Sequence, residues 1–132
     1  MAMVEVLVAV VILGIGVLGT IAMQARAASA MTDASLRSEA TMATEKLLSL
    51  IATDQNNATS YAMNAGGSPP AKVAAWYADT QARIPGAVIS IAVTPAGGVS
   101  TLNTVVTTIT WTRKTGEASL SHVVTSYVAS SL

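Results

Sequence analysis

The sequence predicts an α+β fold in which one long N-terminal helix packs by its C-terminal half on a small antiparallel β-sheet. Three observations predict it. Residues 6–23 form an uncharged apolar stretch, and helix-favouring residues then continue to residue 53 without a proline. Three later segments, 88–94, 102–112 and 120–129, are rich in Val, Ile and Thr and alternate in part between apolar and polar residues. A chain in which helix-forming segments come first and strand-forming segments come last is typical of α+β proteins.

The predicted first helix, residues 2–53, has two parts. Residues 1–23 are long enough to span a bilayer, since about 20 helical residues suffice. Residues 24–53 are amphipathic, and we expect their apolar stripe to cover the sheet. The apolar residues that recur near helical spacing are Ala27, Met31, Ala34, Ala40, Ala43, Leu47, Leu50 and Ile51.

Residues 54–86 are predicted to connect the helix to the sheet. Turn-forming side chains at 54–57 end the helix, and a Gly-Gly-Ser-Pro-Pro run at 66–70 interrupts regular structure. A short helix is expected at 72–83, with Val73, Trp76 and Tyr77 on one side. The last part, residues 87–132, holds the three strands.

Turn-forming residues at 95–98 and 113–116 predict that the three strands form an antiparallel meander. In the middle strand, Val105, Thr107, Ile109 and Trp111 share one face, which we expect to pack on the helix. The aromatic residues Trp76, Trp111 and Tyr127 are predicted to join sheet and helix in the core. Any of the three that proved exposed would be a candidate for adhesion or stacking.

Composition argues against several classes of site. The chain has 7 basic and 7 acidic side chains, so it lacks the positive charge typical of nucleic-acid binding. It has no cysteine, which excludes a disulfide, a thiolate metal site and a cysteine nucleophile. The single histidine, His122, cannot anchor zinc alone and is expected to be exposed or on an edge strand. With its carboxylates scattered singly, the sequence predicts no catalytic residue, metal or cofactor, and the chain is expected not to be an enzyme.

Gly14, Gly16 and Gly19 have the G-x-G-x-x-G spacing of a dinucleotide-binding fingerprint. That fingerprint must follow a strand and open a helix, whereas these glycines lie inside a long apolar segment. The context therefore rejects nucleotide binding. The glycines could instead permit close helix packing or weaken the helix locally, because each costs about 1 kcal/mol relative to alanine.

Glu5 is a lone carboxylate beside the apolar stretch. A charged side chain at membrane depth is costly and needs a partner, for which an α-amino group is the best candidate. A structural alternative is that an acid in a first helical turn is favoured by the helix dipole, by about 0.3–1 kcal/mol. A second alternative, a secretory signal peptide, is disfavoured because no Lys or Arg precedes the apolar run.

The segment MVEVLVAVVILGIGVLG, residues 3–19, resembles the N-terminal helix of mature type IV pilins and pseudopilins. The family has glutamate at its fifth mature position, which Glu5 matches if Met1 is the first mature residue. The family typically starts with Phe, Thr and Leu, whereas this chain reads Met1, Ala2, Met3. Two interpretations of Met1 therefore stay open: a processed and methylated N-terminus, or an engineered start.

The resemblance implies a pilin fold and a subunit of a filament. Such subunits are cleaved by a prepilin peptidase, held in the bacterial inner membrane, and polymerised by pilus assembly machinery with identical or related subunits into an extracellular filament. It also implies that Glu5 pairs with the amino group of Met1 on a neighbouring subunit. The segment from Gly14 to Gly19 is expected to melt partly on assembly, although the proline usual beside it in the family is Ala22 here.

Later residues resemble the PilV-like group of minor pilins: Trp76-Tyr77, Ile84-Pro85-Gly86 and the segment 105–111. A minor subunit, a major subunit and a type II secretion pseudopilin remain alternatives within the superfamily, with adhesion, twitching motility or protein secretion as the implied roles. From a different class, the chain could be a membrane-tethered binding domain that does not polymerise. In that alternative Glu5 would be dispensable.

Overall fold

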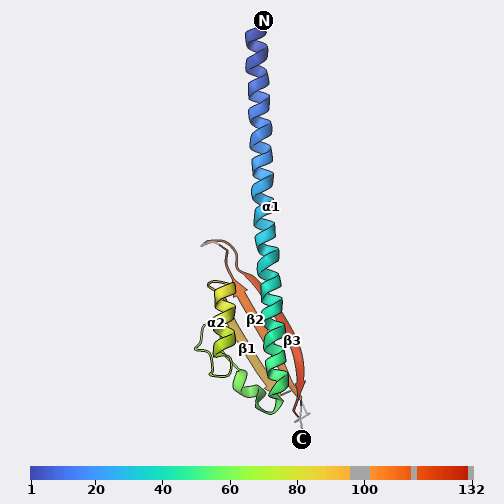
Figure 1. Ribbon diagram of the computed structural model, residues 1–132, viewed down its shortest axis with the longest axis vertical. Helices are drawn as coiled ribbons and strands as arrows, with labels where there is room; N and C mark the ends of the chain where they lie inside the picture. The colour runs from blue at the N-terminus through green and yellow to red at the C-terminus, as the bar shows by residue number, and fades with distance from the viewer. Residues whose placement is uncertain (96–101, 114–115, 131–132) are drawn as a thin grey trace. The chain divides into compact units, whose positions relative to one another are not determined.

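The computed structural model describes residues 1–95, 102–113 and 116–130 and has the predicted α+β architecture (Figure 1). The chain divides into two compact units, Met1–Ser35 and Leu36–Leu132. The elements in chain order are α1 (Ala2–Thr53), the 3₁₀ helix η1 (Gln55–Tyr61), α2 (Ala74–Arg83), β1 (Val88–Pro95), β2 (Leu102–Trp111) and β3 (Leu120–Ala129). The long helix has the bounds predicted from the sequence, and the boundary between the two units falls within it.

The sheet has the strand order β1-β2-β3, with both pairs antiparallel. The predicted meander is therefore confirmed. Its register places Ile109 of the central strand opposite Ile89 of β1 and His122 of β3. Of the two predicted turns, residues 96–98 and 114–115 lie outside the described residues.

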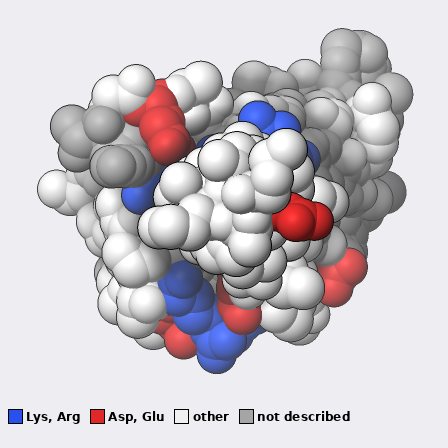
Figure 2. All heavy atoms as spheres, turned by 90° about the horizontal axis from the view of Figure 1, so that it is seen from above, with Lys and Arg blue, Asp and Glu red and all other residues white. Residues whose placement is uncertain are grey.

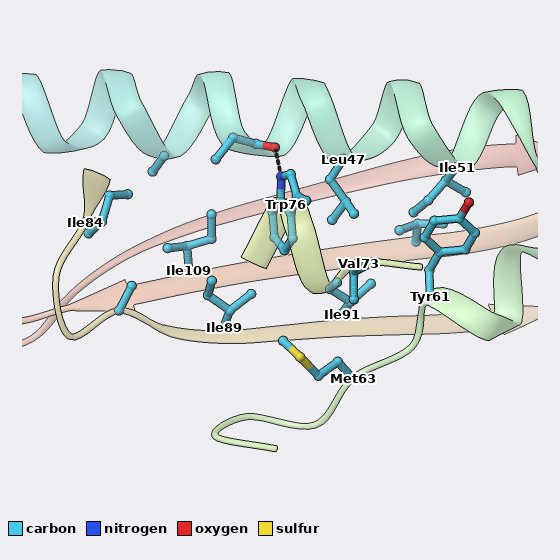
Figure 3. Packing of buried hydrophobic residues seen from close by; sticks show 14 of the residues in the cluster. Leu47, Ile51, Tyr61, Met63, Val73, Trp76, Ile84, Ile89, Ile91 and Ile109 are labelled. Carbon is cyan, nitrogen blue, oxygen red and sulfur yellow. Dashed lines mark hydrogen bonds between the residues drawn. The ribbon is translucent and has the colours of Figure 1, made fainter. Parts of the chain in front are cut away.

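The core of the C-terminal unit lies between α1, α2 and one face of the sheet (Figure 3). The predicted inner face of β2 is confirmed, because Val105, Thr107, Ile109 and Trp111 are all buried. From α2, the indole of Trp76 enters the same core and its Nε1–H donates to the backbone oxygen of Ala43, at 2.8 Å (Figure 3). This bond ties α2 to the second half of α1.

The buried face of α1 is shorter than the predicted stripe and begins only at Ala40. Its buried residues are Ala40, Ala43, Thr44, Leu47 and Ile51. Leu50 is 38% exposed, so its assignment to the stripe was wrong. A helix has 3.6 residues per turn, so the buried residues of α1 lie along one narrow face of the helix. Leu50 lies just beside that face. Ala27, Met31 and Ala34 belong to the N-terminal unit and are exposed, so their assignment to the buried stripe was also wrong.

Tyr127 is not a core residue, which corrects the prediction. It lies opposite Thr104 on the outer face of the sheet and is 65% exposed, whereas its neighbour Val128 is buried. Successive strand side chains point to opposite faces, so only one of these two neighbours can enter the core. Both faces of β3 carry apolar residues. The sequence pattern alone therefore did not decide which face enters the core.

Asp54 organises the turn between α1 and the connecting region, an arrangement that the sequence did not predict. Its carboxylate accepts hydrogen bonds from Asn57 Nδ2 at 2.6 Å and from the Tyr61 hydroxyl at 3.1 Å, and it pairs with Lys72 Nζ. The hydrogen bond from Asn57 and then that from Lys72 lower the pKa of Asp54 below its ordinary value of 3.8. Beyond η1, Met63 forms a β-bridge with Ile91.

This lowered pKa predicts a pH dependence of folding. The folded state favours the charged form of Asp54, so its contribution to stability is present above the ordinary pKa of 3.8 and is lost as pH falls through the folded value. Asp54→Asn should therefore narrow the difference between urea midpoints measured at pH 7 and at about pH 3. Glu45→Gln, which changes an exposed acid of α1, is the control and should leave that difference unchanged. An equal narrowing in both variants would contradict the prediction.

Candidate functional site

The first half of α1 exposes a long, largely apolar surface to its surroundings. All residues from 1 to 28 are exposed. The large apolar side chains among them are Met1, Met3, Val4, Val6, Leu7, Val8, Val10, Val11, Ile12, Leu13, Ile15, Val17, Leu18, Ile21 and Met23. Contiguous exposed apolar surface of this extent marks an interaction with protein or lipid. By length and composition, α1 is the one helix within the described residues that could cross a membrane.

Glu5 lies in the first turn of this surface. Its backbone N–H reaches the carbonyl oxygen of Met1 at 3.4 Å, which starts the helix. The spacing of four residues places the two side chains on the same helix face. Within the described residues, however, neither the Glu5 carboxylate nor the Met1 amino group makes an ion pair or a side-chain hydrogen bond. The structure therefore leaves both charges available to a second molecule.

The other polar side chain of the apolar segment is satisfied internally. Thr20 donates its hydroxyl to the carbonyl oxygen of Val17, at 2.8 Å. Such a local bond lets a threonine enter an apolar environment without an external partner. Glu5 makes no comparable local bond within the described residues, which sets it apart from Thr20.

The three glycines Gly14, Gly16 and Gly19 lie within α1, which is helical without interruption from Ala2 to Thr53. A Cβ atom added at any of them would meet nothing within 4 Å. The isolated chain therefore does not require glycine at these positions for close packing. Partial melting of the segment in a filament stays a prediction.

Alanine at all three glycine positions should leave the isolated chain folded and strengthen its helix by about 1 kcal/mol per substitution. In a filament we expect the native segment from Gly14 to Gly19 to lose helical hydrogen bonds, and the alanine variant to resist that change. Cryo-electron microscopy of native filaments checks the first part directly. A continuous helix through these residues in the assembled native chain would overturn the prediction.

His122 lies on the edge strand β3, as predicted, and is half-buried. Its Nε2 atom is buried and has no hydrogen-bond partner among the described residues. No group of three His, Asp or Glu side chains in the described ranges could hold a metal ion.

A shallow groove of about 150 Å³ lies between the second half of α1 and α2. Its lining comprises Glu39, Met42, Ala43, Lys46, Trp76, Asp79, Thr80 and Arg83. Lys46 pairs with Asp79 at 3.0 Å, and Arg83 pairs with Glu39 at 3.4 Å. The hydrogen bond from Lys46, followed by that from Arg83, lowers the pKa of Asp79. The groove is smaller than the usual 300–1,000 Å³ of a small-molecule site.

These ion pairs were not predicted, because their partners lie 33 and 44 residues apart in the chain. They leave the groove with balanced charge. On the face of the molecule shown in Figure 2, Lys and Arg side chains likewise lie beside Asp and Glu side chains, and neither sign forms a broad patch. The described residues on this face offer no basic surface for a polyanion.

The apolar first half of α1, with Glu5 and Met1 at its start, is therefore the candidate site with the most distinctive chemistry. The groove between α1 and α2 is small and electrically balanced. No protein-family model, curated protein or solved structure matches the chain.

Proposed function

We propose that this protein is a structural subunit of a type IV pilus-like filament, inserted in the bacterial inner membrane and polymerised through its apolar N-terminal helix. The observation that carries the proposal is an unpartnered acid, Glu5, at the start of a membrane-length exposed apolar helix. The helix is joined to a small α+β unit with its own buried core. A simple membrane tether has no need of the acid.

The energetics of assembly follow from the surface of the helix. In lipid, the apolar side chains of residues 6–23 already have apolar neighbours, so burying them against other helices brings little hydrophobic gain. Direction and register must come from specific packing and from polar groups. A carboxylate that lacks a partner in the membrane and is neutralised when the subunit docks would supply both the direction and the register of assembly.

In the proposed filament, the carboxylate of Glu5 accepts hydrogen bonds from the amino group of Met1 on a neighbouring subunit. Neither group has a partner within its own described chain, which supports an intermolecular pair. The proposal requires a free amino group, or its methylated form, at Met1. It therefore also implies a prepilin peptidase and the pilus assembly machinery as partners.

A minor PilV-like subunit is the second candidate, favoured by the resemblance around Trp76-Tyr77 and Ile84-Pro85-Gly86. A minor subunit would enter filaments only together with a different, more abundant pilin. A type II secretion pseudopilin would use the same N-terminal chemistry in a short periplasmic fibre. A membrane-tethered binding domain would form no fibre at all.

Electron microscopy of surface material from cells that express this chain with a pilus assembly system tests the proposal. Antibodies against the C-terminal unit would identify the fibres. Labelling along the whole fibre is expected for a major subunit, and sparse labelling for a minor one. Abundant chain in the inner membrane with no labelled fibre would reject the filament function and favour the tethered domain.

A further inference from the structure

Arg37 and Glu45 are the two charged side chains of the C-terminal unit that make no ion pair within the described residues. The other charged side chains that the structure describes in this unit are all paired. The pairs are Glu39 with Arg83, Lys46 with Asp79, Asp79 with Arg83, Asp54 with Lys72, and Arg113 with Glu117. Internal pairing therefore leaves one described charge of each sign without a partner.

Both unpaired residues lie on one flank of α1. Arg37, Thr41 and Glu45 follow one another at intervals of four residues, which places them along one side of the helix, and all three are exposed. A different flank of α1 faces α2, where Glu39 and Lys46 line the groove. The Thr41 hydroxyl donates to the carbonyl oxygen of Arg37, at 2.9 Å. The exposed flank therefore presents a cation at one end and an acid at the other.

A single copy cannot pair these two charges with each other. Side chains on a helix meet when they are three or four residues apart. Arg37 and Glu45 are eight residues apart in the sequence, which corresponds to about 12 Å of helix rise. A second copy that is parallel to the first and displaced along α1 by about this distance would bring its Arg37 level with Glu45 of the first copy.

This contact can repeat from copy to copy. It uses Arg37 of one copy and Glu45 of the next, so each copy keeps an unused partner for a further copy. Head-to-tail contacts of this kind build open helical filaments when the rotation between copies does not close a ring. The parallel arrangement also keeps every α1 pointing in the same direction. Copies side by side without displacement would instead place like charges against each other, which is unfavourable.

A displacement in the same direction suits the pair at the start of the helix. Glu5 lies four residues after Met1, or about 6 Å of helix rise. A neighbour displaced toward the C-terminal end of α1 therefore brings its Met1 amino group toward Glu5 and its Arg37 toward Glu45. Arg and Glu have long side chains, which can bridge the difference between the two spacings. One displacement between neighbours can thus serve both pairs.

We propose that Arg37 of one subunit pairs with Glu45 of the next subunit in the filament. The inference rests on the proposed filament function and adds to it a contact between C-terminal units. Exposed ion pairs contribute little to stability, so the role of this pair is to select the parallel, displaced register. Removing one charge, as in Glu45→Ala, should therefore leave filaments in place.

Charge reversal tests the pair in the full chain, expressed with a pilus assembly system. Arg37→Glu would place a second acid opposite Glu45, and Glu45→Arg would place a second cation opposite Arg37. Each single reversal should lower the number of labelled filaments several-fold, at equal amounts of chain in the inner membrane. The double variant that carries both reversals restores opposite charges and should restore the filament number of the unchanged chain.

The two single variants control for each other, because they shift the net charge of the chain in opposite directions. A loss in both that the double variant repairs is therefore not an effect of net charge. Urea titration of the purified variants should give the midpoint of the unchanged chain, since neither side chain has an ion-pair partner within its own described residues. A lower midpoint in a single variant would show that the residue acts within its own chain and would overturn the inference.

The failure of this inference can be told apart from the failure of the filament function. Normal filament numbers from both single variants, or no recovery in the double variant, would overturn the pairing and leave the filament function in place. No filaments from the unchanged chain would reject the filament function itself, and this inference with it.

Discussion

Replacing Glu5 with alanine should abolish filament formation while leaving the protein in the inner membrane. In the proposed filament, the carboxylate and the Met1 amino group of a neighbour are buried together. Removing one partner of a buried ion pair leaves the other charge uncompensated, which costs about 3–5 kcal/mol. At about 1.4 kcal/mol per tenfold change, assembly should weaken by at least about a hundredfold. Glu5→Gln, which keeps the polar shape and removes the charge, should also fail to assemble.

The matched control for this prediction is Glu45→Ala. Glu45 is also an acid of α1, but it lies in the C-terminal unit, is exposed and makes no ion pair within the described residues. Its loss should leave filament number and length unchanged. Electron microscopy of surface filaments, with immunoblots of membrane fractions, measures both outcomes. Normal filaments from Glu5→Ala would eliminate the proposed role of this carboxylate.

Replacing Trp76 with alanine should destabilise the C-terminal unit by about 3–5 kcal/mol, the usual cost of removing a buried large aromatic side chain. The indole is 3% exposed and joins α2 to α1 through its bond to the Ala43 carbonyl. Most domains have a total stability of only about 5–15 kcal/mol, so the variant should be largely unfolded at moderate urea concentrations.

Trp76→Phe separates packing from hydrogen bonding at this position. It keeps an aromatic ring in the core but loses the donor, and a typical hydrogen bond contributes about 0.5–1.5 kcal/mol. Urea titration followed by the fluorescence of Trp111, the remaining tryptophan, compares the two variants. A loss as large in Trp76→Phe as in Trp76→Ala would mean that the hydrogen bond, rather than the packed ring, holds α2 in place.

Much of the fold followed from local sequence patterns. The bounds of α1 and the inner face of β2 were predicted because helix propensity and the alternation of strand side chains are properties of neighbouring residues. Glu5, Met1 and the glycines were singled out for the same reason, since an acid beside an apolar run is visible in the sequence. Their intermolecular roles remain predictions.

The errors came from places where local patterns are ambiguous. Tyr127 and Val128 are both apolar neighbours on β3, and only the position of the sheet against α1 decided that Val128 is buried. Leu50 lies at the margin of a helical face whose width depends on what packs against it. In both cases, the residues that are near in sequence do not determine which side chain is buried.

The sequence by itself determined a long helix with an apolar first half, a lone acid at its start, and three strands in a meander. Its charge balance and lack of cysteine also narrowed the classes of site. Only the tertiary structure decided which residues close the core, how Lys46 and Arg83 find acids far along the chain, and that β3 lies at one edge of the sheet. Helix and strand formation depends on near neighbours, whereas burial, ion pairing and strand order depend on contacts between segments distant in sequence.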